Sequence, residues 1–469
     1  MPELPEVETF ARGLNLRLKG KRILDVLLFR PKNIVGDPDE FKETLKVKTI
    51  LGVSRRGKYL IFSLSEGYSF LSHLRMEGRW KKLPFDCPID KHRILSMALD
   101  DNSRLDYVDT RKFGTLELKR NKDVFSTPPL SLLGPEPLDV DFETFKERIQ
   151  TENKPVKEVL MDQTILAGIG NIYADESLYK AKIHPFEPAA NLDDGELKTL
   201  YQAIRTILNL AISLRGSSVH SYVPTFETEP ASMQERLLVY GRAHEPCEAC
   251  GTPLTYTKLN GRGTTYCPIC QKRKNAAFVL AITGPIHAGK SIAGLFFETQ
   301  GFAHFDADME VKKLYKQADI QSTMKEILGK KAIVKKQVDA PYLRDLFAKN
   351  PLKKKEWMDY LYPKLEEAYL SFYASNKNTT GILLDVPLLL DSPFLNCPDA
   401  ILLIDADIEA RKQRLIDEGR DVENLMKINA SYPLKQTKKI ATFVIENNGG
   451  LDDFSNELNL LLRRIREAR

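Results

Sequence analysis

The chain has 469 residues, of which 28% are charged and 42% hydrophobic, ordinary proportions for a globular protein that exclude a disordered or fibrous one. This length predicts several domains, each able to bury a core. The formal net charge of +5 permits binding to a polyanion but does not by itself indicate it. Because the sequence has no long apolar run and no charged-then-apolar leader, we expect a cytoplasmic protein that does not bind a membrane.

Helix-like and strand-like patterns alternate over residues 1–120. A helical stretch at 9–18 is followed by short β runs at 24–29, 59–64 and 104–108. These patterns predict a β-sandwich with an N-terminal helix lying along it.

A segment rich in proline, residues 127–137, indicates a linker. From residue 141 to about 214 the pattern is helical with short breaks, which predicts a small helical domain. We place the domain boundaries of this part of the chain at 1–135 for the β-sandwich domain, 136–230 for the helical domain and 231–273 for a cysteine-containing domain.

Four of the six cysteines form two C-x2-C pairs with sixteen residues between the pairs. Two short turns of this kind on a β-hairpin can hold a metal tetrahedrally, and the spacing is typical of structural zinc. Disulfides are the alternative, but they do not suit a reducing compartment. We therefore predict structural Zn²⁺ on Cys247, Cys250, Cys267 and Cys270.

The pattern changes after residue 277. A buried strand at 278–283 runs into a glycine-containing turn and a helix, and later apolar strands at 382–385 and 400–404 are separated by helical patterns. This alternation predicts a domain at 278–469 with a parallel sheet covered by helices on both faces.

The N-terminus is the first candidate for chemistry. Removal of Met1 would leave Pro2 with a secondary amine, and an α-amino group has a pKa near about 8, so much of it is an unprotonated nucleophile at neutral pH. Such an amine attacking a sugar C1′ gives an iminium, an electron sink. Glu3 and Glu6 add two carboxylates, one to shuttle protons and one to stabilise positive charge. The alternative is a disordered acidic N-terminus with two turn prolines.

Further segments share an order and spacing with a known family. They are PELPE at 2–6, RGKYL at 56–60, HLRMEGR at 73–79, DTRKFG at 109–114, MDQ at 161–163 and GIGNIYADE at 168–176. Over residues 1–273 the chain resembles the formamidopyrimidine-DNA glycosylases, which excise oxidised purines. Leu4, where the sister family endonuclease VIII usually has glycine, favours the purine branch. The resemblance implies a glycosylase and AP lyase acting on 8-oxoguanine and formamidopyrimidines in double-stranded DNA.

The resemblance also implies residue roles in DNA binding. An enzyme that extrudes a nucleotide must fill the hole left in the duplex. Met76, Arg111 and Phe113 match the family's void-filling residues, although core packing is the ordinary role of a Met or Phe. Lys58 matches a lysine that contacts phosphate and transfers protons.

Four further residues match contacts of the family to the DNA backbone: His92, Lys157, Asn171 and Arg262. The last lies between the cysteine pairs, where an arginine would otherwise simply be solvated. Residues 216–225 correspond to the loop that closes over the flipped purine. Its sequence departs from the family after Gly216-Ser217-Ser218, which leaves the base preference open.

A phosphate-binding loop opens the second half. The sequence GPIHAGKS at 284–291 satisfies G-x4-G-K-S after a strand and before a helix. In such a loop the backbone N–H groups cradle phosphates, the lysine reaches the terminal ones, and the serine binds Mg²⁺. The candidate ATP-binding residues are Gly284, His287, Ala288, Gly289, Lys290 and Ser291.

Segments DAD at 306–308, DVPLL at 385–389 and IENNG at 445–449 make residues 278–469 similar to dephospho-coenzyme A kinase. The resemblance implies ATP and dephospho-coenzyme A as substrates and Asp308 as the base for the ribose 3′-hydroxyl. It implies a role for Arg414 on the lid and phosphates. Pro285 and His287 depart from the glycine-rich loop of the family, since Pro285 lacks an N–H and His287 adds bulk.

The sequence thus favours a monomeric fusion of a DNA glycosylase with a kinase. One alternative keeps the glycosylase and makes the second half a non-catalytic nucleotide-binding or docking module. Another is a lesion-binding protein without chemistry, which the presence of Pro2, Glu3 and Lys58 disfavours.

Overall fold

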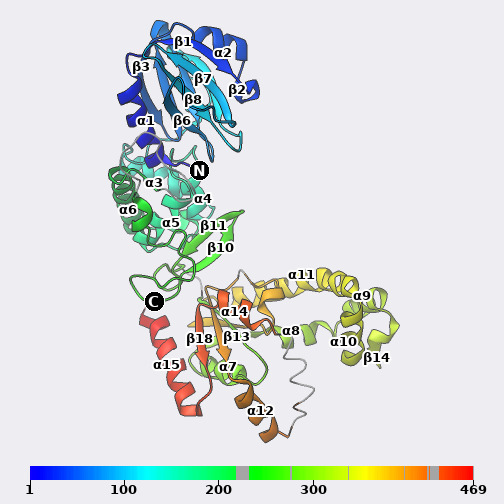
Figure 1. Cartoon of the computed structure of the whole chain (residues 1–469). Helices are drawn as coiled ribbons and strands as arrows, with labels where there is room; N and C mark the ends of the chain where they lie inside the picture. The colour runs from blue at the N-terminus through cyan, green and yellow to red at the C-terminus, as the bar shows by residue number, and fades with distance from the viewer. Residues whose placement is uncertain are drawn as a thin grey trace. The chain divides into compact units, whose positions relative to one another are not determined.

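The computed structural model describes residues 1–217, 232–274, 277–335, 337–395, 397–419, 422 and 432–467. The chain divides into two compact units, Met1–Gly241 with Lys258–Tyr266 and Arg242–Thr257 with Cys267–Arg469 (Figure 1). Among the helices of the described residues, none combines the length and apolar character needed to span a bilayer.

The first unit begins with a helix and two packed sheets. One sheet has the strand order β1-β7-β8-β6 and the other β2-β9-β5-β4-β3. The elements are α1 (Leu4–Leu18), β1 (Ile23–Leu28), β2 (Ile34–Val35), α2 (Pro38–Leu45), β3 (Ile50–Arg56), β4 (Tyr59–Leu64), β5 (Tyr68–His73), β6 (Arg79–Pro84), β7 (Arg93–Leu99), β8 (Ser103–Val108) and β9 (Thr115–Arg120). Neighbouring strands are antiparallel except β2 and β9, which run parallel.

Aromatic rings join the two sheets. The ring of Trp80 on one sheet lies 4.9 Å from that of Phe62 and 5.9 Å from that of Phe70 on the other. All three side chains are fully buried, because alternate residues of each strand point into the space between the sheets. The predicted β-sandwich is confirmed.

Helix α1 starts five residues earlier than the hydrophobic pattern indicates. Glu3 is its N-cap and forms a capping box with Glu6, while Pro5 occupies the first turn, where its missing N–H costs nothing. The residues predicted to carry chemistry therefore also begin the helix.

The proline-rich linker is packed against the rest of the unit. Gly134 N–H donates to Gln163 O at 2.9 Å, and a Cβ at Gly134 would lie 2.4 Å from Ile165 O. The buried carboxylate of Glu136 accepts hydrogen bonds from Gly57 N–H at 2.6 Å and from the guanidinium of Arg55 at 2.6 Å. The linker therefore fixes the helical domain to strand β3.

The helical part follows, as predicted. Its elements are α3 (Phe142–Gln150), α4 (Val156–Met161), α5 (Asn171–Ala181), α6 (Asp194–Ser213) and the hairpin β10 (Thr255–Leu259) and β11 (Arg262–Tyr266). Helix α5 is buried along most of its length and packs against α6. Of the loop 216–225, only Gly216 and Ser217 lie within the described residues.

The second unit contains a five-stranded parallel sheet of order β13-β16-β12-β17-β18. Its strands are β12 (Val279–Thr283), β13 (Phe302–Asp306), β16 (Gly381–Asp385), β17 (Ala400–Asp405) and β18 (Phe443–Glu446). The strands predicted at 278–283, 382–385 and 400–404 each agree to within one residue.

Helices cover both faces of this sheet. Val279 and Ala281 of the central strand share a core with helices α8, α9 and α11, whereas Leu280 and Ile282 point to the opposite face and are fully buried there. The helices are α7 (Lys290–Thr299), α8 (Ala307–Leu314), α9 (Ala318–Leu328), α10 (Ala340–Lys349), α11 (Pro351–Asn376), α12 (Ile408–Asp417), α14 (Leu434–Ile440) and α15 (Leu451–Glu467).

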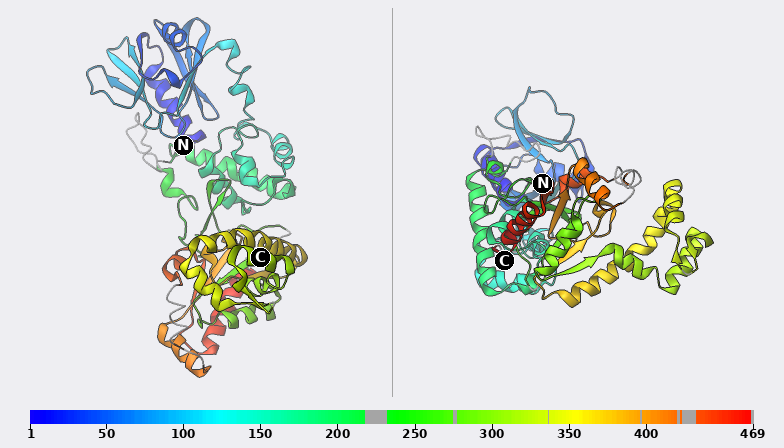
Figure 2. Two further views of the ribbon diagram at one scale, coloured as in Figure 1. Left: turned by 90° about the vertical axis from the view of Figure 1, so that its right-hand side faces the viewer. Right: turned by 90° about the horizontal axis from the view of Figure 1, so that it is seen from below.

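One group of elements extends away from the sheet. Helices α9 and α10 pack against the long helix α11, and the small hairpin β14 (Ile333–Val334) and β15 (Gln337–Val338) packs against α9 (Figure 2). The turn that leads into α7 follows the carboxyl end of β12. The carboxyl end of β16 lies close to the start of α7.

Candidate functional site

Glu3 occupies the N-terminus of helix α5. Its carboxylate accepts hydrogen bonds from Gly170 N–H at 2.7 Å, Ile172 N–H at 2.8 Å and Tyr173 N–H at 3.3 Å. An anion is stabilised there by the otherwise unpaired amides of the first turn. Gly170 is required for this approach, because a Cβ at that position would lie 2.4 Å from Glu3 Cδ. Residues 167 positions apart in the chain are thereby joined.

Pro2 is buried next to Glu3, while Met1 remains 47% exposed. Met1, the residue whose removal would free the Pro2 amine, therefore lies at the surface of the unit. The position of Pro2 suits the predicted role of its amine, because the neighbouring Glu3 carboxylate is held rigidly.

Lys58 lies in the same cluster. Its Nζ donates to Ile169 O at 2.8 Å, within the turn that precedes α5. Burial lowers the pKa of the Lys58 ammonium, although the carboxylates of Glu3 and Glu6 oppose this effect. The cluster thus combines a buried lysine with a lowered pKa and a fixed carboxylate.

Glu6 connects the cluster to the start of the 216–225 loop. Its carboxylate accepts hydrogen bonds from Glu3 N–H at 2.9 Å, Ser217 N–H at 2.8 Å and the hydroxyl of Tyr173. Burial raises the pKa of Glu6 to about 7, and the charge of Glu3 adds to this shift. Both oxygens of Glu6 are engaged, which suits a residue that holds other groups in place.

The three predicted void-filling residues lie together on the surface. Met76 and Phe113 are 46% and 57% exposed, so neither packs in the core. Arg111 Nη1 lies 2.8 Å from Met76 Sδ, and its guanidinium lies 5.2 Å from the centre of the Phe113 ring. Asp109 fixes the loop by accepting from Arg111 N–H at 2.9 Å and Gly114 N–H at 2.7 Å.

The four residues predicted to contact the DNA backbone differ in how far they are exposed. His92 is half-buried, and Arg262 is exposed at the start of β11. Asn171 Nδ2 donates to Gly263 O at 2.8 Å, and its buried Oδ1 has no hydrogen-bond partner within the described residues. Lys157 is placed differently from the expectation. Its side chain is only 1% exposed, so in this structure it offers no surface to a DNA backbone.

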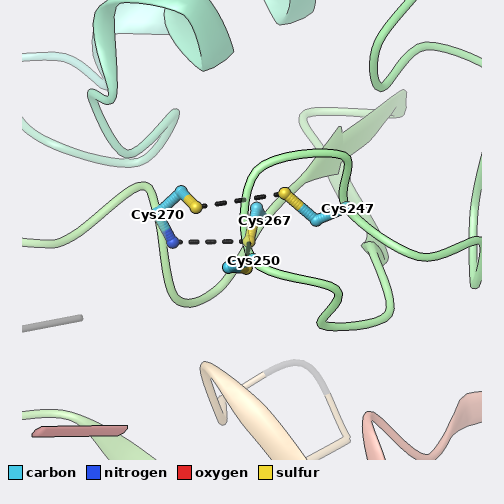
Figure 3. Close-up of side chains that lie close together, drawn as sticks. All are labelled: Cys247, Cys250, Cys267 and Cys270. Carbon is cyan, nitrogen blue, oxygen red and sulfur yellow. Dashed lines mark hydrogen bonds between the residues drawn. The ribbon is translucent and has the colours of Figure 1, made fainter. Parts of the chain in front are cut away.

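The four cysteines of the C-x2-C pairs converge (Figure 3). Cys247 Sγ lies 3.9 Å from Cys270 Sγ, and Cys250 Sγ lies 3.5 Å from Cys267 Sγ. A disulfide requires about 2.05 Å, so the disulfide alternative is wrong. Thiolates placed tetrahedrally about 2.3 Å from Zn²⁺ stand about 3.8 Å apart, which fits both distances.

In the second unit, the predicted phosphate loop joins β12 to α7. Lys290 is the first residue of α7, and its Nζ lies 3.0 Å from Asp385 Oδ1 at the end of β16. Burial opposes ionisation of Asp385, but His304 and Lys290 outweigh it and hold the pKa of this carboxyl below its usual range. Gly289 has φ of +108°, and a Cβ there would lie 2.3 Å from Asn447 Nδ2.

His287 adopts a conformation that favours glycine, with φ of +60°. Its carbonyl accepts from Arg414 Nη1 at 3.0 Å, and Arg414 Nη2 also donates to Asn447 O at 2.7 Å. The imidazole Nδ1 lies 3.4 Å from Glu418 Oε1, at the C-terminal end of α12. The side chain is thus directed toward α12.

Asp308 lies in the first turn of α8. Desolvation raises the pKa of its carboxyl, the charge of Lys290 opposes this, and Asp306 and Asp385 add to it. A carboxyl with a raised pKa near a phosphate loop suits a proton acceptor.

Three family models match the first part of the chain in succession. They are the formamidopyrimidine-DNA glycosylase N-terminal domain over residues 1–116, the formamidopyrimidine-DNA glycosylase H2TH domain over 133–223, and the zinc finger found in FPG and IleRS over 245–273. The formamidopyrimidine-DNA glycosylase of Bacillus cereus (strain ATCC 10987 / NRS 248) is 44% identical over 278 residues, which cover 58% of this chain and 100% of the relative. The chain belongs to the formamidopyrimidine-DNA glycosylase family.

Other relatives agree. The formamidopyrimidine-DNA glycosylase of Lactobacillus gasseri is 42% identical over 273 residues, 58% of this chain and 99% of that protein. The complex of the Lactococcus lactis enzyme with abasic-site DNA has 40% identity and a TM-score of 0.55, covering 58% of this chain and 100% of that one. A complex of MutM with DNA containing carbocyclic 8-oxo-G has 39% identity, a TM-score of 0.55 and the same coverage.

The second unit has its own family. The dephospho-CoA kinase model matches residues 278–453. The chain is therefore a glycosylase-family protein that continues into a dephospho-CoA kinase domain, as the sequence motifs predicted.

Sequence reasoning missed several residues that hold the glycosylase site. Gln163 accepts from Gly168 N–H and donates to Ile169 O, both at 2.9 Å, and so shapes the turn before α5. Glu176 accepts from the amides of residues 238–240, and Asp175 is ion-paired to Lys157. The one signal in the sequence for Asp175 and Glu176 is that two acidic residues stand side by side within a helix that is buried along most of its length.

Proposed function

We propose that residues 1–273 form a base-excision DNA glycosylase and AP lyase for oxidised purines in double-stranded DNA. The observation that carries the proposal is the convergence of Pro2, Glu3 and Lys58 at the N-terminus of α5. Relatives of this architecture have been solved with abasic and 8-oxo-G-containing DNA, which supports the same class of ligand for this chain.

In the proposed reaction the Pro2 amine attacks C1′ of the damaged nucleotide. The new C1′–N bond forms as the glycosidic bond breaks, and the base leaves with the bonding electrons and takes up a proton. The Pro2 nitrogen then loses its proton, the C1′–O4′ bond of the sugar ring breaks with O4′ taking up a proton, and a C1′=N iminium is left. The iminium withdraws electrons from C2′, so a proton is lost there and the bond from C3′ to its phosphate oxygen breaks, with the phosphate as leaving group. Glu3 is placed to move protons, and buried Lys58 is placed to give one up.

The void-filling cluster of Met76, Arg111 and Phe113 would replace the extruded nucleotide. Its exposure and its anchoring by Asp109 support this role, because a filler must project from the protein on a fixed loop. His92, Asn171 and Arg262 would contact the backbone around the lesion.

Borohydride trapping tests this proposal. Reduction of the iminium should leave a covalent adduct with a duplex carrying 8-oxoguanine opposite cytosine. Pro2→Gly, or a tag left uncleaved before Pro2, should abolish the adduct. Glu3→Gln should impair base removal more than incision at a preformed abasic site. If a tagged, unprocessed protein traps as well as the native one, Pro2 is not the nucleophile.

For the second unit we propose dephospho-CoA kinase activity, with ATP as donor. The observation that favours it is the pairing of Lys290 with Asp385 where the loop of residues 284–289 enters α7. Ser291 and the nearby carboxylates are oxygen ligands of the kind that Mg²⁺ prefers, and the ion would neutralise phosphate charge. Asp308 would accept the proton of the ribose 3′-hydroxyl, and Arg414 would stabilise the phosphates.

The rival for this unit is a non-catalytic nucleotide-binding or docking module. The departure at His287 leaves the kinase proposal intact because the imidazole is directed toward Glu418. Incubation with ATP and dephospho-coenzyme A should give a product that depends on both. Absence of product at high enzyme concentration would favour the rival.

A further inference from the structure

Strand β11 of the β10–β11 hairpin packs against helix α5 (Figure 1) and accepts hydrogen bonds from Lys157 of α4. At the tip, Asn260 Nδ2 donates to Glu158 Oε1 at 2.6 Å. At the far end, the ring of Tyr266 packs edge-on against that of His184, with 4.7 Å between centroids. Between these points lies a run of polar contacts from residue 263 to residue 265.

A buried ion pair makes most of these contacts. Lys157 Nζ lies 2.7 Å from Asp175 Oδ1, and both side chains are only 1% exposed. The same Nζ donates to Gly263 O at 2.8 Å and to Thr264 Oγ1 at 2.9 Å. Asp175 Oδ2 accepts from Thr265 N–H at 3.1 Å. One ion pair therefore holds three successive residues of the hairpin.

The ammonium of Lys157 is enclosed by protein groups. It donates two of its three N–H groups to Gly263 and Thr264 and lies against the Asp175 carboxylate, and the side chain is only 1% exposed. A direct contact with DNA would require Lys157 to become exposed. Arg262, by contrast, is exposed and immediately precedes the three held residues.

We infer that Lys157 and Asp175 are positioning residues that set the place of Arg262 by holding residues 263–265 against α5. The inference rests on the proposed role of Arg262 in binding the DNA backbone. The zinc site would then order the cysteine turns, while the ion pair aligns the strand that carries the arginine. Burial strengthens such a pair electrostatically and makes either partner costly to leave alone.

Asp175→Asn separates this inference from a direct phosphate contact by Lys157, because the two expectations have opposite signs. If Asp175 merely restrains a phosphate-binding lysine, its neutralisation should free Lys157 and tighten DNA binding. If the pair positions Arg262, binding should weaken by about tenfold, the effect of losing one charge-assisted hydrogen bond. The measurement is the Kd of the full-length protein for a duplex with a tetrahydrofuran abasic analogue opposite cytosine.

A double-mutant cycle with Arg262→Ala sharpens the test. Since both changes remove the same contact, Asp175→Asn should add little to the loss already caused by Arg262→Ala. Each variant should lower the slope of log K against log salt by about one unit. If Arg262→Ala weakens binding while Asp175→Asn does not, the positioning role is wrong. If Arg262→Ala itself has no effect, the proposed DNA contact fails instead.

Loss of folding is distinguished by two further readouts. The Asp175→Asn protein should retain zinc, and hydrogen exchange should speed up at the amides of residues 263–266 but not in the β-sandwich. Unchanged exchange at these amides would overturn the inference whatever the measured DNA affinity.

Lys146→Met is the matched control. Its ammonium lies 2.7 Å from Asp194, but the two side chains are 28% and 69% exposed, so this pair contributes little and its loss should leave DNA binding unchanged.

Discussion

Each of the two units contains a helix N-terminus that is suited to an anion, but the anions differ. Each enters a helix N-terminus through a turn containing a glycine with φ of +108°, Gly168 before α5 and Gly289 before α7. At α5 the amides of the first turn are occupied by a carboxylate of the protein itself, Glu3. At α7 no carboxylate within the described residues accepts a hydrogen bond from the N–H groups of residues 289–292. The ammonium of Lys290 lies beside the carboxylate of Asp385.

The difference indicates how each helix start is used. Filling the α5 terminus with Glu3 fixes the carboxylate proposed to act in catalysis beside Pro2, so the helix would position part of the proposed active site. Leaving the α7 terminus open, with a cation nearby, suits a ligand that carries its own negative charge. Changes at each terminus should therefore affect one unit and spare the other.

The largest effect is expected at the open terminus. Lys290→Ala should reduce ATP- and dephospho-coenzyme-A-dependent product by about a thousandfold, because positioning and charge stabilisation supply most of the catalysis in phosphoryl transfer. Asp308→Asn should act in the same direction. Excision of 8-oxoguanine by the same protein should be unaffected. A Lys290→Ala protein with near-native phosphoryl transfer would exclude the proposed phosphate loop.

At the filled terminus, Gly170→Ala should lower excision and borohydride trapping by about a hundredfold. The new Cβ would meet Glu3 within 2.4 Å, and displacement of a catalytic group by about 1 Å is enough for such a loss. Gly450→Ala is a matched control, because a Cβ there meets no atom within 4 Å. Native trapping by Gly170→Ala would mean that the seat of Glu3 is not needed for the chemistry.

The filled terminus also predicts a pH effect, because Glu6 is buried beside Glu3 with its pKa raised from 4.5 to about 7. Between these values the folded protein binds a proton that the unfolded chain does not, so this group lowers stability as pH rises. Relative to Glu6→Gln, the wild type should lose about 1.4 kcal/mol per pH unit, up to about 3 kcal/mol. Urea unfolding of both proteins at pH 5, 6 and 7 measures the difference. A difference that stays constant with pH would contradict the raised pKa.

Much of this arrangement follows from the sequence. The strand at 59–64 was predicted to the residue, and the central strands of the kinase domain to within one, because period and apolar runs are local signals. The start of α1 was missed because Glu3 and Glu6 were assigned to chemistry alone, although the same glutamates form a capping box.

The ion pair of Lys157 with Asp175 could not be predicted. Its partners are 18 positions apart, and their burial depends on the hairpin that covers them. A lysine in a family motif is first interpreted as a phosphate contact, since sequence gives charge but not exposure. Tertiary packing decides which of the two roles applies.

Metal removal should distinguish the glycosylase part of the chain from the kinase domain in a different way. Cys250→Ser should release zinc and disorder the cysteine turns, because tetrathiolate sites supply folding energy directly. DNA affinity should fall by about tenfold or more through loss of the Arg262 contact, while ATP binding survives. Metal analysis and titrations with a duplex and with ATP measure the three quantities. Full DNA affinity in a zinc-free protein would mean that the position of Arg262 does not depend on the metal.

The smallest effect is expected at His287, one of the two residues that depart from the glycine-rich loop of the family. Its φ of +60° costs a non-glycine residue roughly 1 kcal/mol, which His287→Gly would relieve, while the greater freedom of glycine in the unfolded chain offsets part of the gain. The rate of phosphoryl transfer should stay equal or rise.

Lys182→Gly is the matched control, because Lys182 has φ of +57° at the end of α5, far in sequence from the phosphate loop. Both variants should be slightly stabilised, and only His287→Gly should change turnover. A large fall in turnover for His287→Gly would mean that the imidazole side chain of His287 itself contributes to nucleotide binding or phosphoryl transfer.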